Sequence, residues 1–267
     1  MREWLHLYLV LAGARVRADW QYRTSFVLFT ITQFAITFLD FLLIVVLFNR
    51  VSRLAGWSLA EVAFLYGLSG VAFFVADVFV SQVERVSVYV RSGRFDSLLV
   101  RPLGPLFQLA TDDFALRRAG KLVQACLVLG VAIAALDIEW TLLRVAVVAM
   151  AIVAGTVIFS AVWIGGVALT FWAVEAQEVV NSFTYGGNYA TQYPLGVFAA
   201  WVRHMLTFVV PAAFVSYYPA LYVLGRDDTL GLPQSVRFLS PVAALASAMV
   251  ARWLWSAGIR HYRSTGS

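Results

Sequence analysis

The chain consists of long apolar runs separated by shorter polar segments. A helix needs roughly 17–25 mostly apolar residues to cross the hydrocarbon core of a bilayer. Six runs meet or approach this length: Phe26–Phe48, Val62–Val80, Gly120–Leu136, Leu143–Trp172, His204–Leu224 and Phe238–Trp255. The pattern predicts an all-α integral membrane protein with six transmembrane helices.

The composition excludes a soluble enzyme. Hydrophobic residues make up 61% of the 267 residues and charged residues only 13%, whereas roughly a quarter of a soluble domain is charged. The mean hydropathy of +0.79 agrees with this excess. So apolar a chain needs a bilayer as its solvent. The single cysteine, Cys126, argues against an intrachain disulfide and against a cysteine-rich metal site.

The basic residues predict the orientation of the chain. Its net charge of +5 would suit nucleic-acid binding, but basic residues also gather on the cytoplasmic loops of membrane proteins, so we expect no nucleic-acid partner. With the N-terminus inside, the inner segments hold thirteen basic residues: Arg2, Arg15, Arg17, Arg23, Arg85, Arg91, Arg94, Arg101, Arg117, Arg118, Lys121, Arg260 and Arg263. The outer loops hold four: Arg50, Arg53, Arg226 and Arg237. This bias predicts that both termini are cytoplasmic.

The first 25 residues predict a helix that lies in the inner interface of the membrane. On a helix, one face would collect Leu5, Tyr8, Leu9, Ala12, Val16 and Trp20. The alternative is a signal peptide with its apolar core at Leu5–Leu11 and cleavage after Ala14. Cleavage there would place the following arginines outside and invert every later loop, against the charge distribution.

The longest polar stretch, Ser81–Ala119, lies on the predicted inner side. Within it, Arg85–Arg91 alternates with the period of a strand, but a lone strand would leave its backbone groups without partners, so we expect a helix. Gly93 suits the end of that helix. Arg94–Val100 then predicts a short surface helix, which closes before Pro102. We expect a compact, structured, cytoplasmic loop.

Breaks are expected in the second half of the chain. Gly186-Gly187 is expected to break the polar segment Val174–Tyr193, and Pro211 and Pro219 interrupt the fifth apolar run. Irregular backbone at membrane depth needs cover from protein or a cavity, so we predict a kinked or partly re-entrant segment on the outer side. Neither an internal repeat nor a low-complexity linker divides the sequence, and we expect a single domain over residues 1–267.

Two acidic residues fall inside the apolar runs, where ionisable groups are costly and often functional. Asp40 lies in the first run without a partner in its own helix, so we expect it to face a cavity or another helix. Asp77 lies near the inner end of the second run, where the simplest interpretation is that it reaches the interface. Both are candidates for the lining of a translocation path.

Groups for catalysis or for binding a cofactor are not evident in the sequence. It contains neither a phosphate-binding loop nor a pair of histidines spaced to hold a metal. Gly67-Leu68-Ser69-Gly70 matches an element of rhomboid-type intramembrane proteases, whose serine needs a histidine from a neighbouring helix. His204 is expected at the inner end of its run and Ser69 nearer the outer half of its own. Helix packing by small residues is therefore the favoured interpretation, and a protease the remote alternative.

The predicted interfacial helix, six spans, structured loop and broken outer segment together resemble the type-2 permeases of ATP-binding-cassette (ABC) exporters. The most specific stretch, Ser92–Leu103, is similar to the coupling-helix region of small bacterial permeases. The stretches Ala190–Pro194 and Phe208–Pro219 are similar to the same group. The outer loop after the fifth run is short, unlike that of members with large external domains.

This resemblance implies that the chain is not an enzyme but half of a transmembrane pore, as a homodimer or as a heterodimer with a similar permease. Two cytoplasmic ATPase subunits would dock on the loop and bind ATP and Mg²⁺, so this chain would need no cofactor or metal of its own. The implied coupling residues are Arg91, Gly93, Arg94, Phe95, Asp96, Arg101 and Pro102.

The resemblance also implies a location in the bacterial plasma membrane. An aromatic-rich interior with few charges favours hydrophobic or amphiphilic cargo. A secondary transporter or channel is the alternative class, for which paired repeats of inverted topology would be expected in many cases.

Overall fold

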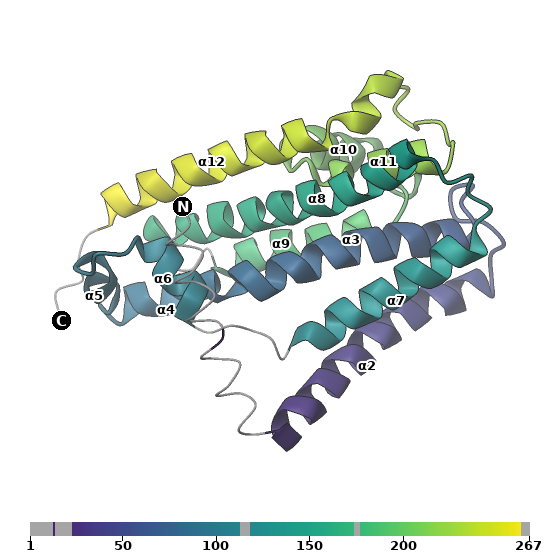
Figure 1. Cartoon of the computed structure of the whole chain (residues 1–267). Helices are drawn as coiled ribbons and strands as arrows, with labels where there is room; N and C mark the ends of the chain where they lie inside the picture. Colours follow the sequence, from purple (N-terminus) through teal and green to yellow (C-terminus); the bar gives the residue numbers. More distant parts are fainter. Residues whose placement is uncertain (1–12, 14–22, 113–117, 174–176, 263–267) are drawn as a thin grey trace.

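The computed structural model describes residue 13 and residues 23–112, 118–173 and 177–262 (Figure 1). Over these residues the chain is helical and contains no β-strand beyond one isolated bridge between Leu54 and Trp57. The predicted interfacial helix over residues 1–25 lies outside the described residues, apart from residue 13 and from residues 23–25, which begin the first long helix. The predicted all-α fold class is confirmed for the part that the structure describes.

Five predicted apolar runs correspond to single helices whose ends differ from the prediction by a few residues. These helices are α2 (Arg23–Phe48), α3 (Leu59–Val80), α7 (Ala119–Ala135), α8 (Leu142–Ala168) and α12 (Ser240–His261). Four candidate spans, α2, α3, α8 and α12, are long and apolar enough to cross a membrane, whereas α7 is shorter. α3 continues through η1 (Ser81–Arg85) and α4 (Val86–Arg91), and α8 continues through η3 (Leu169–Phe171).

The fifth apolar run is bent, as predicted. Its first half comprises α10 (Ala200–His204) and the π-helical turn η6 (Met205–Val209), and its second half comprises η7 (Ala212–Phe214) and α11 (Tyr217–Val223). The two halves meet at an angle of 75° and would give a fifth span if counted together. Pro211 lies at the bend, but the prediction for Pro219 was wrong. This proline occupies the first turn of α11, where a missing N–H breaks no helical hydrogen bond.

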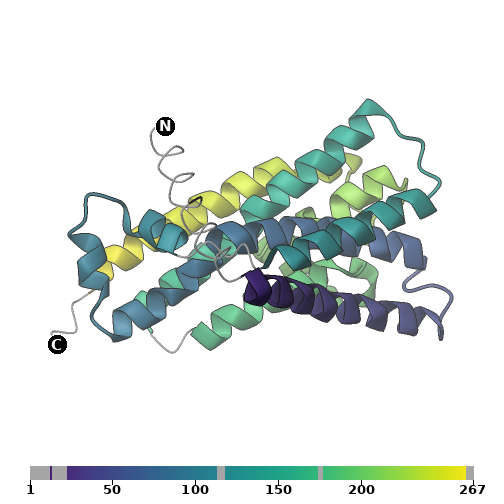
Figure 2. The same cartoon turned by 60° about the horizontal axis from the view of Figure 1, so that its bottom comes forward.

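The expected break at Gly186-Gly187 was also wrong, because helix α9 (Gln177–Thr191) runs through both glycines. Each glycine costs about 1 kcal/mol in a helix. That cost is offset because one face of α9 is buried, with Val180, Thr184 and Asn188 each at most 6% exposed. α9 contacts α3 and α8 and lies beside them in both views (Figures 1 and 2).

Close helix contacts at small residues bring α3 to the centre of the bundle, against α7 and α8. A Cβ atom added at Gly67 of α3 would lie 2.7 Å from the backbone of Leu129 in α7. A Cβ atom at Gly155 of α8 would lie 2.9 Å from Ala72 of α3. The helices can approach this closely only with glycine at these two positions.

The two ends of the bundle differ. One end carries α4, α5 (Phe95–Leu99), α6 (Pro105–Asp112) and the end of α12 (Figure 1). The opposite end carries the turns between α2 and α3 and between α11 and α12 (Figure 1). There Arg226 donates two hydrogen bonds to the Glu61 carboxylate at the start of α3, at 2.6 and 2.8 Å, and one to the carbonyl of Gly56 at 3.0 Å, which ties the two turns together.

Candidate functional site

The loop between α3 and α7 begins with a sharp change of direction. Helix α4 ends at Arg91 and is capped by Ser92, whose backbone N–H donates to the carbonyl of Val88 at 3.0 Å. Gly93 follows with a φ of +67°, in the left-handed region that glycine adopts without strain. The chain then enters the short helix α5. The predicted helix over 85–91 and the predicted glycine end are both confirmed.

The side chain of Phe95 anchors α5 to the helix bundle. It is fully buried, and its ring centroid lies 5.1 Å from that of Phe171 and 4.9 Å from that of Tyr262. Trp255 lies 5.6 Å from Phe171 and completes the cluster, which we call the aromatic joint: Phe95, Phe171, Trp255 and Tyr262. A Cβ atom at Gly258 would lie 2.5 Å from the Phe171 ring, so glycine makes room for it. The joint connects α5 with the C-terminal ends of α8 and α12.

A second contact fixes the far end of α5. Gln108 of α6 is buried, and its Nε2 atom donates to the carbonyls of Leu98 and Leu103 at 2.8 and 2.6 Å. These bonds satisfy a carbonyl that the end of a short helix leaves without a helical donor. Helix α5 is therefore held on its inner face by apolar burial and at its end by hydrogen bonds.

The outer face of the loop carries most of the predicted coupling residues. The exposed ones are Arg91, Arg94, Arg101 and Pro102, while Gly93 and Asp96 are half-buried. The Arg94 guanidinium lies 5.4 Å from the centre of the Tyr89 ring. Burial, together with the nearby charge of Asp96, raises the pKa of the Tyr262 hydroxyl. Phe95 differs from the other predicted residues because it faces the bundle and supports them from behind.

Asp77 is buried among other side chains at the end of the bundle that carries α5. The residue is 1% exposed and forms an ion pair with Arg118, next to the start of α7. The Lys121 ammonium lies 3.9 Å from the other carboxylate oxygen. A buried carboxylate needs such partners, because removing it from water is costly. The pair ties α3 to the beginning of α7.

Sequence reasoning missed Glu84, which connects three helical segments. Its Oε1 atom accepts hydrogen bonds from Trp163 Nε1 of α8 at 2.6 Å and from the Tyr185 hydroxyl of α9 at 3.2 Å. The signal was present in the two aromatic residues, because a buried tryptophan or tyrosine usually finds a polar partner. Glu84, Asp77 and Arg118 thus form a polar layer at the end of the bundle that carries α5.

Asp40 of α2 faces another helix, as expected. Its carboxylate is half-buried and lies close enough to the Lys121 ammonium and the Tyr189 hydroxyl of α9 to be influenced by both. Tyr189 itself is 51% exposed. The side of the bundle between α2 and α9 therefore presents polar groups at a depth where lipid-facing residues are normally apolar.

Ser69 has the surroundings of a packing residue. It is fully buried, and its hydroxyl hydrogen-bonds to the Thr191 hydroxyl of α9. The His204 ring contacts the carbonyl of Ala200 within its own helix. The serine and the histidine therefore do not form the pair that a serine protease requires.

The described residues contain no group of three His, Cys, Asp or Glu side chains that could hold a metal ion. The helices and the anchored polar loop define a multi-pass membrane protein with a structured polar end. The chain belongs to the ABC-2 family of transporter proteins, whose family model matches residues 34–266. Comparisons with curated proteins and with solved structures gave no match. The chain is therefore the membrane component of an ABC-2 type transporter, a non-catalytic transport subunit.

Proposed function

We propose that the chain forms half of the translocation pore of an ABC exporter and pairs with itself or with a second similar permease. Two cytoplasmic ATPase subunits would dock on the loop that carries α5 and would bind ATP and Mg²⁺. The observation that carries this proposal is the anchoring of α5. A helix of five residues is held rigidly from behind by Phe95 while the arginines beside it stay exposed.

In this proposal the chain is one domain with six crossings. Helix α8 ends at the end of the bundle that carries α5, and α12 begins at the opposite end, so the chain must cross once between them (Figure 1). We assign this fifth crossing to α9 and its continuation, since 15 helical residues span about 22 Å. The bent pair of half-helices is then a re-entrant element on the outer side.

The arginines around α5 support a cytoplasmic location for that end, because basic residues favour the inner side of a membrane. Both termini are then cytoplasmic, and a bacterial plasma membrane is the location that the proposal implies. Asp40 and Tyr189 would line the pore toward the second permease, because polar groups at membrane depth avoid lipid. The pair of Asp77 and Arg118 would lie at the inner end of this path. Hydrophobic or amphiphilic cargo suits the few charges of the bundle.

The double variant Arg94→Ala with Asp96→Ala tests the docking surface. Truncating a charge inside a protein interface typically costs about 2 kcal/mol or more, which is roughly thirtyfold in affinity. We therefore expect folding and membrane insertion to be retained while the affinity for the ATPase falls about thirtyfold. Arg50→Ala with Glu139→Ala is the matched control, since it removes the same two charges from exposed positions at the opposite end.

The measurement is the binding of the ATPase subunit to the reconstituted permease, together with the rate of export. The control variant should bind and export like the wild type. Wild-type ATPase affinity and export in the Arg94 and Asp96 double variant would show that these residues are not the coupling contacts. Purification of the wild-type chain from native membranes as a stable complex without an ATPase would contradict the proposed function itself.

A further inference from the structure

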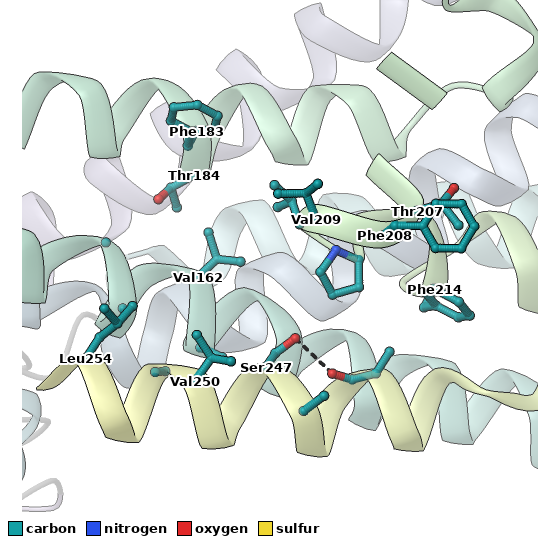
Figure 3. A pocket seen from close by; sticks show the side chains of 18 of the residues that line it. Val162, Phe183, Thr184, Thr207, Phe208, Val209, Phe214, Ser247, Val250 and Leu254 are labelled. Carbon is teal, nitrogen blue, oxygen red and sulfur yellow. Dashed lines mark hydrogen bonds between the residues drawn. The ribbon is translucent and has the colours of Figure 1, made fainter. Parts of the chain in front are cut away.

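An apolar cavity of about 580 Å³ lies between α8, α9, the π-helical turn and α12. Figure 3 shows Val162 of α8, Val209 of the turn and Val250 of α12 around it. Phe183 and Leu254 close other sides. The volume lies within the range of about 300–1,000 Å³ that is typical of ligand pockets.

The chemistry of the wall suits a hydrocarbon. Among the described residues that line the cavity, none is charged. The Thr184 hydroxyl donates to the carbonyl of Val180, and the Ser247 hydroxyl donates to the carbonyl of Ala243, so both are satisfied within their own helices. The protons of these two hydroxyls are therefore used within the helices, and most of the remaining wall is apolar.

The rim of the cavity opens toward the bilayer. Val209 is 75% exposed, Val250 is 57% exposed and Phe183 is 51% exposed. Val250 lies on α12, which is long and apolar enough to span the membrane, and the π-helical turn belongs to the bent apolar segment. Exposed apolar side chains in such segments contact lipid tails. A molecule that enters through this rim therefore comes from the hydrocarbon of the membrane.

The size of the cavity distinguishes between the occupants that a bilayer can supply. One turn of an α-helix with its side chains occupies roughly 400–600 Å³, from a diameter of about 10–12 Å and a rise of 5.4 Å. The cavity would hold about one such turn, so a spanning helix of a second permease does not fit into it. A slender, unbranched chain does fit.

Polar groups also lie at the edge of the cavity. The Thr207 hydroxyl is buried there, close to the Tyr218 hydroxyl. The Val210 N–H donates to the carbonyl of Met205 at 3.0 Å, but Pro211 has no N–H with which to continue the series. The Leu206 carbonyl therefore lacks this donor, and the head of a molecule with an apolar chain would meet polar groups beside the break.

We propose that this cavity binds one acyl chain of a membrane phospholipid. The lipid wedges the bent segment against α8 and α12 and fills space that would otherwise be empty beside the break. This site is separate from the docking surface and from the polar side of the bundle between α2 and α9. It does not depend on which ATPase or second permease the chain pairs with.

Photolabelling tests the proposal. The transporter complex is reconstituted into vesicles of phosphatidylethanolamine and phosphatidylglycerol that contain a phosphatidylethanolamine with a diazirine near the end of one acyl chain. After irradiation, adducts are mapped by peptide mass spectrometry. We expect adducts to be enriched about tenfold at residues 205–211 and 242–254 relative to Leu28, Ile31 and Leu39 of α2, which are exposed, apolar and outside the cavity.

Val162→Trp fills the cavity and should remove this enrichment while labelling of α2 stays unchanged. Leu245→Trp is the control. Leu245 lies on α12, is 65% exposed and does not line the cavity. It should keep the enrichment. Ala246→Phe, which fills the cavity from its exposed rim on α12, serves if Val162→Trp does not accumulate. Adducts no denser than on α2 in the wild type, or enrichment that persists in the filled variants, would overturn the proposal.

Discussion

Replacing Phe95 with leucine should separate docking of the ATPase from transmission of its motion. The phenyl ring is fully buried behind α5, whereas the arginines expected to contact the ATPase are on the outer face. Leucine fills much of the same space without an aromatic ring. The docking surface should therefore persist while its mechanical connection to α8 and α12 weakens.

The structure sets the size of the effect. The Phe95 ring makes two aromatic contacts, with Phe171 and with Tyr262. Each such pair is worth about 0.5–1.5 kcal/mol beyond its buried area, so the variant loses about 1–3 kcal/mol at the joint. If the joint connects α5 with the opposite end of the bundle, this loss lowers the factor by which nucleotide shifts the equilibrium at that end by about 5–150-fold.

The assay does not need a known cargo. A single cysteine at Thr229, exposed at the opposite end of the bundle, is introduced into a Cys126→Ser background of the reconstituted complex. The fraction of this cysteine that reacts with maleimide is measured without nucleotide and again with ATP and vanadate. Each fraction gives an equilibrium constant between the reactive and the unreactive state, and the ratio of the two constants is the coupling factor. We expect this factor to fall about 5–150-fold in Phe95→Leu while the ATPase stays bound.

Phe159→Leu is the matched control for a general loss of packing. Phe159 is also buried, and its ring lies 5.0 Å from that of Phe73, but it belongs to α8 and not to the joint. It should lower thermal stability without changing the coupling factor. An unchanged coupling factor in Phe95→Leu would refute the reasoning. Loss of the ATPase from this variant would also refute it, since the docking surface would then depend on the ring.

Two further variants test the turn before α5 and the buried ion pair. Gly93→Val forces a side chain into a left-handed conformation at a cost of about 1–2 kcal/mol. It should redirect α5 and reduce recovery of the ATPase in affinity purification, whereas Gly93→Asn should retain most of it. Asp77→Asn leaves Arg118 without its counter-charge and should destabilise the bundle by about 3–5 kcal/mol in denaturant unfolding. Asp77→Asn with Arg118→Met should restore most of that stability, and equal loss in both variants would contradict the ion-pair explanation.

The spans that the sequence predicted well are those that length and apolarity alone are enough to recognise. α2, α3 and α8 need no particular partner to be recognised. Helix α9 was missed because Gly186-Gly187 and several polar residues weigh against a membrane helix when read locally. Its stability comes instead from the buried face of Val180 and Asn188, a tertiary effect that helix propensity does not contain.

The joint was predicted only in part, for a similar reason. Phe95 was assigned to the coupling region through the short motif around it, but its partners lie far away in sequence. The chain has 20 phenylalanines, and which of them meet depends on where α8 and α12 end. Gly258 provides the one local signal, since a glycine inside a membrane helix often marks a close approach.

Helix α12 offers a physical route between the two ends of the molecule. At one end Trp255 belongs to the joint that holds α5, and at the other the Ser240 hydroxyl donates to the carbonyl of Phe214 in the bent segment, at 2.7 Å. The 22 residues of α12 span about 33 Å as one continuous helix. Since a regular helix transmits displacement along its axis with little deformation, movement of α5 would reach the outer break through α12 without passing along the polar side of α2 and α9.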